Sequence, residues 1–540
     1  MWLNEYKIKK RPAGHIEPPA KRLLHRRHTP LQEPDNAFAM CGTDFRKGGE
    51  ALNKFALHAV RKAIRTLGRP RGNRILNVGS LCTGSAGDAV ALDTLQAALE
   101  TESIDIAFEH IFYCEKVESK RDRWCKKVHS VIAGTEVDAL LPCAFTDCEQ
   151  LGTPSARCTM HTKKHAECTC TLPSHLCLLI AGISCKDFSR ANMNKGQYSQ
   201  GNTGIFNAQH TPGGSAQTMH AVLALASKIN IEALLLENSD ELAGNIHSPS
   251  LDEFLSALGA KGYDCHAFVM NSSTYAVPQE RKRIYIFAVK RPNKSFNIQS
   301  GESFYKGVET FLKACRTDGP DFTSCLLDED DETVQNFLAH RTSKESKGWE
   351  TKTLATHRDK WMKATRQWMG YFQVSTADAQ SPWYRTLAAR EKDLLAWHQY
   401  KTAGTDTAAT SRRKATDLHQ SIDQFTWAAC GPNDKVHVPT ILPQAKLWVS
   451  CEQHRMLTGA ESLEFQGWPI YDPRFAELLQ NESNNNQQDL AGNAFPTTCI
   501  VACVVAIIFA GDVKEEGDTS ISSTAADVQK ALQLMKHSNS

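Results

Sequence analysis

The sequence predicts an α/β fold, a doubly wound and mainly parallel sheet, for the segment from about residue 74 to residue 289. Short apolar runs of strand length recur along this segment, and helix-like patterns lie between them. Such alternation is typical of a parallel sheet with helices on both faces. The composition agrees with a globular chain, because the 540 residues are 41% hydrophobic and 23% charged, which excludes a fibrous or wholly disordered protein.

Five apolar runs are the candidate strands, and residues 216–228 form a candidate helix between two of them. The runs are residues 75–78, 110–114, 176–180, 233–236 and 284–289. Ligands of such sheets bind beyond the carboxyl ends of the strands. We therefore expect the functional residues directly after these runs.

The longest apolar run, residues 499–510, is too short to cross a membrane, because a spanning helix needs about 20 residues. We interpret it as a core helix. The first residues lack the apolar core of a signal peptide, so we expect neither secretion nor membrane insertion. The 18 cysteines are therefore interpreted as reduced thiols, metal ligands or a nucleophile.

The net charge of +2 is unevenly distributed along the chain. Residues 1–34 contain eight Lys/Arg against three Glu, a local charge of +5, which leaves −3 for the rest. This composition predicts a basic, disordered arm over residues 1–45, either a nuclear import signal or a nucleic-acid arm. A solvated tail without a task is the alternative. Residues 513–540, rich in Ser, Thr and charge, are expected to be loosely attached.

A glycine-containing loop, residues 80–88, follows the first candidate strand, and carboxylates follow two later apolar stretches. Gly84 and Gly87 permit a tight turn and the close approach of a ligand to the backbone. Glu115 could accept hydrogen bonds from both ribose hydroxyls of a nucleoside cofactor, and Asp147 could meet an adenine amino group. A plain turn with two surface acids is the alternative.

Residues suited to covalent chemistry lie near the next strands. Cys185 follows the run 176–180 among polar and cationic neighbours, where a thiolate nucleophile could form. A buried structural cysteine is the alternative. Glu237 ends the neighbouring strand and could be an acid beside the cysteine. Arg281 and Arg283 start the following strand and point to one side of it.

The order of these motifs resembles that of the cytosine-C5 DNA methyltransferases: a glycine loop, Glu, Asp, Gly-x-x-Cys-x-x-Phe-Ser, Glu-Asn and Gln-x-Arg-x-Arg. Residues 455–469 and 491–496 are similar to the family's ninth and tenth motifs. The sequence departs from the family at three positions. Ser184 stands where proline usually precedes the nucleophile, Cys82 where an aromatic residue would face adenine, and Ser239 where valine usually follows Glu-Asn.

The resemblance implies the fold of S-adenosylmethionine-dependent methyltransferases and a covalent reaction. It implies that Cys185 attacks C6 of cytosine and that Glu237 hydrogen-bonds or protonates N3. Arg283, with Arg281, would orient the base oxygen or a nearby phosphate. The base has to leave the duplex stack for this attack. The implied cofactor is S-adenosylmethionine, and the residues implied to bind it are Leu81, Cys82, Gly84, Gly87, Glu115, Asp147, Cys148, Ser184 and Asn493.

The resemblance also divides the chain. It places the catalytic core at residues 70–292 and 447–512, with an inserted target-recognition region at residues 293–446. Within residues 341–415, fifteen Lys/Arg stand against seven Asp/Glu, a net charge of +8 that favours phosphate contact. The aromatic residues of this stretch could stack on bases, but we assign most of them to a small local core.

A Cys/His cluster lies outside the family pattern. Its five candidate ligands, within thirteen residues, are Cys158, His161, His165, Cys168 and Cys170. Residues of these types could close a tetrahedral structural zinc site. Cys143, Cys148 and Cys177 lie nearby as further candidates. An exposed polar insertion is the alternative.

The sequence therefore predicts a DNA cytosine-5 methyltransferase that acts in the nucleus through a covalent Cys–C6 adduct. A transfer-RNA cytosine-5 methyltransferase shares the motifs and is the nearest alternative, although the long recognition region favours duplex DNA. A non-catalytic nucleic-acid-binding regulator on the same fold is a further class. The presence of Cys185, Glu237 and Arg283 argues against it.

Overall fold

The structure is a computed structural model of the chain. It describes residues 50–151, 158–161, 170, 172–185, 188, 215–244, 248–343, 355–356, 358–359, 362–363, 373–402, 414–419, 429–430 and 436–511. The predicted basic arm and the predicted tail lie outside these residues, as do the candidate ligands His165 and Cys168.

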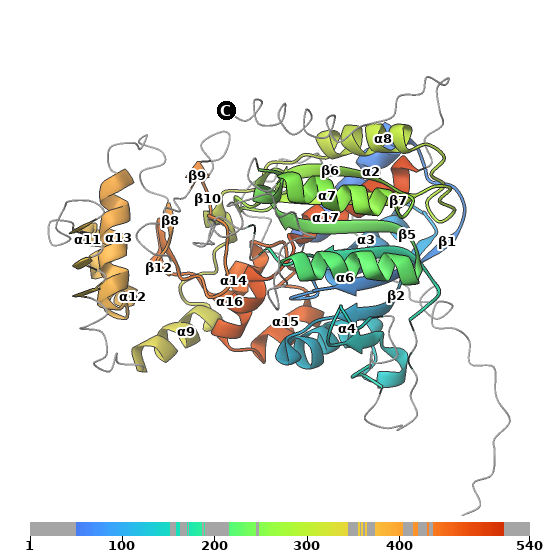
Figure 1. Cartoon of the computed structure of the whole chain (residues 1–540). Helices are drawn as coiled ribbons and strands as arrows, with labels where there is room; N and C mark the ends of the chain where they lie inside the picture. The colour runs from blue at the N-terminus through green and yellow to red at the C-terminus, as the bar shows by residue number, and fades with distance from the viewer. Residues whose placement is uncertain are drawn as a thin grey trace, which may run out of the picture.

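A seven-stranded sheet forms the centre of the molecule, in the order β3-β2-β1-β4-β5-β7-β6 (Figure 1). Its strands are β1 (Arg74–Leu81), β2 (Ile106–Cys114), β3 (Cys143–Phe145), β4 (His175–Gly182), β5 (Asn230–Ser239), β6 (Tyr263–Asn271) and β7 (Lys282–Lys290). Neighbouring strands pair in parallel except β7, which is antiparallel to both β5 and β6. The predicted mainly parallel sheet is thus confirmed.

The inner strands are buried on both faces, which explains why they read as continuous apolar runs. Residues 176–181 of β4 and 233–239 of β5 are all buried. The five predicted runs lie within β1, β2, β4, β5 and β7. The edge strand β6, in which buried and partly exposed residues mix, was not among the predicted runs.

Helices cover both faces of the sheet (Figure 1). Those behind it, which contact one another, are α2 (Glu50–Leu67), α3 (Gly87–Thr101), α8 (Gly301–Ala314) and α17 (Thr497–Ala510). Those in front are α6 (Ser215–Lys228) and α7 (Ser248–Gly259). Helix α4 (Lys126–Ala133) packs beside α3. Short helical turns span Ser119–Cys125, Asp138–Leu140, Asp240–Ala243, Ser272–Thr274 and Phe322–Cys325.

The folded core extends beyond the residue limits 70 and 292 that the sequence suggested for its first part. Helix α2 precedes the first limit, and its apolar side chains, among them Phe55 and Val60, are buried in the main core. Helix α8 follows the second limit and buries Phe304 and Phe311 in the same core. Both helices contact α17, so each covers apolar surface that would otherwise face water.

Every residue of α17 is buried. Residues 484–510 are long and apolar enough to cross a membrane, but 94% of the window that meets this criterion is buried inside the protein. Contacts with α2, α3 and α8 account for the apolar composition of α17. The core helix predicted at residues 499–510 is therefore confirmed.

A second, smaller core lies in the part drawn on the left of Figure 1, where α11, α12 and α13 stand apart from the large sheet. Its elements are α9 (Glu332–Ser343), α11 (Thr376–Gln380), α12 (Pro382–Arg385), α13 (Ala389–Thr402), β8 (Lys414–Asp417), β11 (Leu447–Ser450) and β12 (His454–Met456). Trp383 and Trp397 are buried in this core, as predicted for most aromatics of the region, whereas Tyr400 is 51% exposed.

The remaining elements lie between β8 and β11 or between β12 and α17 in the sequence. They are β9 (Ala429–Cys430), β10 (Val436–His437), α14 (Gly459–Glu464), α15 (Pro473–Gln480) and α16 (Asn484–Gly492). Strands β8, β11 and β12 form an antiparallel sheet, and β9 pairs with β10.

Candidate active site at the carboxyl ends of the strands

The loop after β1 has a backbone that requires small residues. Cys82, Gly84 and Ala86 have φ angles of 53°, 57° and 62°, in the left-handed region that favours glycine. A Cβ atom on Gly84 would lie 2.4 Å from the carbonyl oxygen of Asn493, so a side chain there would displace backbone. The loop therefore lies directly against a segment about 400 residues later in the sequence.

The same late segment also contacts the end of β4. A Cβ atom on Gly182 would lie 2.9 Å from Cζ of Phe495. Asn493 contributes its main chain to this contact region, since its exposed side chain donates hydrogen bonds to the carbonyl and Oδ1 of Asp489 at 2.7 and 3.1 Å. Residues 493–495 thus close the carboxyl ends of β1 and β4 from the outside.

Glu115, directly after β2, is a fixed acceptor beside the glycine loop. Its side chain accepts hydrogen bonds from the backbone N–H of Gly84 at 3.0 Å and of Val117 at 2.9 Å. The residue is only 7% exposed. Arg121 donates to the carbonyl of Glu115 at 3.2 Å and holds the main chain in place. The carboxylate therefore sits where β1 and β2 both end, with the loop folded over it.

Cys82 and Asp147 approach the same region from β1 and from beyond β3. Oδ1 of Asp147 accepts a hydrogen bond from the N–H of Glu149 at 2.9 Å, which fixes the carboxyl within its turn. A hydrogen bond between the thiols of Cys82 and Cys148 raises the pKa of Cys82 and lowers that of Cys148. Two thiols joined by a hydrogen bond therefore lie at position 82, where the family that the sequence resembles usually has an aromatic residue.

The segment that carries Cys185 is held by hydrogen bonds on both sides. The N–H of Ile183 donates to the carbonyl of Glu237 at 3.1 Å, and the Asn238 amide donates to the carbonyl of Ile183 at 3.3 Å. On the other side, the N–H of Ser184 donates to Oγ1 of Thr218 in α6 at 3.3 Å. Cys185 itself is a free, partly exposed thiol at the end of this clamp.

Glu237 lies at the end of β5 and forms an ion pair with Arg283. Oε1 of Glu237 lies 3.0 Å from Nε of Arg283, although the N–H direction does not meet the geometry of a hydrogen bond. The antiparallel register brings them together, because Arg283 is opposite Ser239, two residues beyond Glu237. Glu237 is 9% exposed, so its carboxylate is shielded from most solvent. The positive charge of Arg283 orients this carboxylate.

Arg281 makes different contacts from those expected of a base-orienting residue. Its guanidinium donates to the carbonyls of Ile441 and Ala494, each at 3.2 Å, and the residue is buried. Burial, and then the charge of Arg283, lower its pKa to about 10. Within the described residues its contacts join the start of β7 to the late segment that covers the glycine loop.

The comparison with known families decides between the protein classes that such a site allows. The family model of the C-5 cytosine-specific DNA methylases matches residues 154–508, more than half of the chain. This chain belongs to the C-5 cytosine-specific DNA methylase family.

Relatives of this chain include fungal and bacterial proteins. The DNA (cytosine-5-)-methyltransferase DMT5 of Cryptococcus neoformans var. grubii is 24% identical over 457 residues, which are 82% of this chain and 17% of the relative. The type II methyltransferase M.HhaI of Haemophilus parahaemolyticus is 22% identical over 173 residues, 32% of this chain and 48% of the relative. The chain thus spans less than half the length of each of these relatives.

Among solved structures, the chain is similar to Spodoptera frugiperda DNMT2, with 13% sequence identity and a TM-score of 0.36. The match covers 81% of this chain and 99% of that chain.

Arg455 and Glu461, in the segment that resembles the family's ninth motif, form a buried network. Arg455 and Glu461 form a fully buried ion pair at 2.6 Å, and Glu461 completes a capping box with Thr458 at the start of α14. Arg455 and Glu461 also bond the carbonyl and the N–H of Leu327, both at 2.8 Å. Because a buried charge that loses its partner is costly, this network firmly joins the segment at Leu327 to the segment 455–461.

Three features of the candidate site were not predicted from the sequence. Thr218 and the amide of Asn238 hold the Cys185 segment, and Asp88 is buried beneath the glycine loop. Asp88 accepts a hydrogen bond from Ser80, and burial raises its pKa to about 6. The place of Asp88 in the glycine loop could have marked it in the sequence. No sequence pattern marks Thr218.

We expect Asp88→Asn to stabilise the folded protein at pH 7. The folded-state pKa near 6 lies above the ordinary 3.8, so the protonated carboxyl favours the fold below about pH 4, and this contribution is lost as the pH rises through 6. The difference of about two pH units corresponds to about 3 kcal/mol. Asparagine does not ionise and keeps an oxygen acceptor for Ser80.

Denaturant unfolding of both proteins between pH 5 and pH 8 measures this effect. The gain of the variant should grow with pH across this interval and level off above pH 7. Equal stability of the two proteins at pH 7 would show that the Asp88 carboxylate is better solvated than its burial implies.

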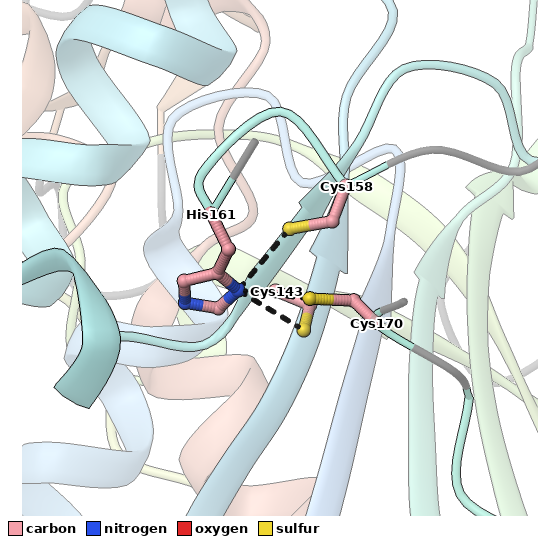
Figure 2. Close-up of side chains that lie close together, drawn as sticks. All are labelled: Cys143, Cys158, His161 and Cys170. Atoms are coloured by element: carbon pink, nitrogen blue, oxygen red, sulfur yellow. Dashed lines mark hydrogen bonds between the residues drawn. The ribbon is translucent and has the colours of Figure 1, made fainter. Parts of the chain in front are cut away.

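The group of possible metal ligands in the structure differs from the predicted one. Cys158, His161 and Cys170 lie together, and Cys143 at the start of β3 joins them (Figure 2). The other two predicted ligands, His165 and Cys168, lie outside the described residues.

Proposed function

We propose that this chain transfers a methyl group from S-adenosylmethionine to C5 of cytosine in DNA. The observation that carries the proposal is the join between β4 and β5. The N–H of Ile183 bonds the carbonyl of Glu237, so the segment that bears Cys185 is fixed to the strand end that bears Glu237. A nucleophile and an acid on neighbouring strand ends can act on one ring at the same time.

The residues around the glycine loop fit a nucleoside cofactor. The Glu115 carboxylate faces the loop and now accepts from two backbone N–H groups, and ribose hydroxyls are donors of the same kind. A side chain at position 84 would collide with the main chain of Asn493, which lies over the loop. Asp147 would bind the adenine amino group, and Leu81, Cys82, Cys148, Gly87 and Ser184 would line the pocket. When bound, S-adenosylmethionine supplies an electrophilic methyl group.

Residues of the chain supply the activation of cytosine. The Cys185 thiolate adds to C6 and forms a carbon–sulfur bond, and the displaced electron pair moves toward N3. Glu237 hydrogen-bonds or protonates N3 and so absorbs this charge. C5 then becomes nucleophilic and takes the methyl group. Loss of the C5 proton to a base and expulsion of the thiolate restore the aromatic ring and the enzyme.

Arg283 orients the Glu237 carboxylate and would lie close to the bound cytosine. Its ion pair with Glu237 at 3.0 Å orients that carboxylate before substrate arrives. A guanidinium in this position can also donate to the O2 oxygen of cytosine or to a phosphate. Arg281, bonded to Ile441 and Ala494, acts by holding the covering segment in place.

DNA is the proposed partner because a long recognition region accompanies the site. The net charge of +8 over residues 341–415 favours contact with phosphates, and the basic arm suggests nuclear import. The described part of this region has its own core and so can present a stable surface beside the sheet.

Transfer of labelled methyl groups tests the proposal and separates the substrates. The full chain is incubated with S-adenosylmethionine labelled in the methyl group and with either duplex DNA or transfer RNA. We expect incorporation into DNA, as 5-methylcytosine, and none into RNA. Incorporation into RNA alone would replace the substrate, and no transfer to either would favour a non-catalytic role.

A further inference from the structure

We propose that Cys143, Cys158, His161 and Cys170 bind one zinc ion as a tetrahedral Cys₃His site. Their ligand atoms all lie within 4.8 Å of one another, and the four side chains converge from different parts of the chain (Figure 2). Cys143 begins β3, and the other three belong to the segment between β3 and β4. None of these three cysteines forms a disulfide bond.

The distances agree with those of a zinc shell. Nδ1 of His161 lies 3.1 Å from the sulfur of Cys170, 3.4 Å from that of Cys158 and 3.6 Å from that of Cys143. Zinc bonds of about 2.3 Å to sulfur and about 2.0 Å to nitrogen place such atoms roughly 3.5 Å apart at a tetrahedral angle. One ion at the centre of the cluster would therefore reach all four ligands with small movements.

The second nitrogen of His161 fixes the ring in the form that a metal needs. Nε2 lies 2.8 Å from the carbonyl oxygen of Asp138. A carbonyl only accepts, so Nε2 carries the proton and Nδ1 presents its lone pair to the three sulfur atoms. Histidine ligands of metals commonly donate their other ring N–H to a backbone carbonyl in this way.

Hydrogen bonding alone explains the cluster less well. One lone pair on Nδ1 cannot accept from three thiols at once, yet all three sulfur atoms lie within 3.6 Å of it. Three sulfur ligands and an imidazole are a donor set that suits zinc.

Backbone hydrogen bonds join the described residues at Cys158 to strand β3. Cys158 forms an antiparallel bridge with Phe145, and the N–H of Thr159 donates to the carbonyl of Ala144 at 2.8 Å. A metal held by Cys143 and Cys158 would close the chain between them at its base. The site would therefore fasten the short edge strand β3 to the segment that follows it, a structural role separate from methyl transfer.

Zinc content of the purified full chain, measured by mass spectrometry after dialysis, tests the proposal. We expect about one zinc per chain in the wild type and at least a fivefold loss in Cys143→Ser. Cys265→Ser, which changes another partly exposed strand cysteine, is the matched control and should retain the metal. Cys168→Ser should also retain it, because four other ligands complete the shell. Zinc-free wild type, or zinc lost from Cys168→Ser and kept by Cys143→Ser, would overturn the assignment.

A second measurement on the unchanged protein covers the case in which Cys143→Ser does not fold. The native chain is alkylated with and without a zinc chelator, and the modified peptides are mapped. Alkylation of Cys143, Cys158 and Cys170 should rise at least fivefold with the chelator, while that of Cys265 should not change. Equal alkylation of the three cysteines in both samples would contradict a bound metal.

Discussion

Replacement of Cys185 by alanine should abolish methyl transfer and leave the affinity for S-adenosylmethionine almost unchanged. The thiol is the proposed nucleophile, and an alanine side chain cannot form the bond to C6. The segment itself is held through main-chain atoms of Ile183 and Ser184, so the substitution should not disturb it. Labelled methyl transfer and calorimetric titration of the cofactor measure the two effects.

Cys265→Ala is a suitable control for this variant, because Cys265 is a partly exposed strand cysteine outside the site. It should keep wild-type turnover. Substantial residual turnover in Cys185→Ala would mean that another residue is the nucleophile. Loss of cofactor binding together with turnover would mean that the substitution acts through the pocket and not through the chemistry.

Glu237→Gln should lower kcat by roughly 10²-fold or more, the usual scale of general-acid catalysis. Glutamine keeps the shape of the side chain but has no proton of suitable acidity for N3. It also leaves Arg283 without the negative charge that lies 3.0 Å from its Nε atom. Because both effects grow as charge develops on the ring, kcat should fall more than the KM for DNA rises.

Glu232→Gln provides the matched control, since Glu232 lies on the same strand and bonds His175 at 2.6 Å and the N–H of Ser295 at 2.8 Å, away from Cys185. It should leave kcat unchanged even if the melting temperature falls. A wild-type kcat in Glu237→Gln would show that N3 is contacted by another group.

The positions of Cys185 and Glu237 could be predicted from the sequence because β4 and β5 are buried on both faces. Each strand is then a continuous apolar run, and the first polar residues after it mark the carboxyl end. The parallel register of adjacent strands brings Gly182 opposite Glu237. For these residues, local patterns in the chain determine their place in the fold.

Contacts between distant segments could not be predicted in this way. The guanidinium of Arg281 bonds the carbonyls of Ile441 and Ala494, which are 160 and 213 residues away, and no local pattern in the sequence indicates these contacts. The sequence marked Cys143, Cys148 and Cys177 equally as further candidates for the Cys/His cluster, and the pairing of Phe145 with Cys158 is the contact that brings Cys143 beside the other ligands.

The most direct test of the central claim is covalent capture on DNA that contains 5-fluorocytosine. Fluorine replaces the C5 proton whose loss releases the enzyme, so the bond between Cys185 and C6 should persist after methyl transfer. We expect one DNA adduct per protein molecule, and its formation should depend on S-adenosylmethionine. Peptide mass mapping should locate the adduct on Cys185. An adduct on another cysteine, or none from protein that methylates ordinary DNA, would contradict it.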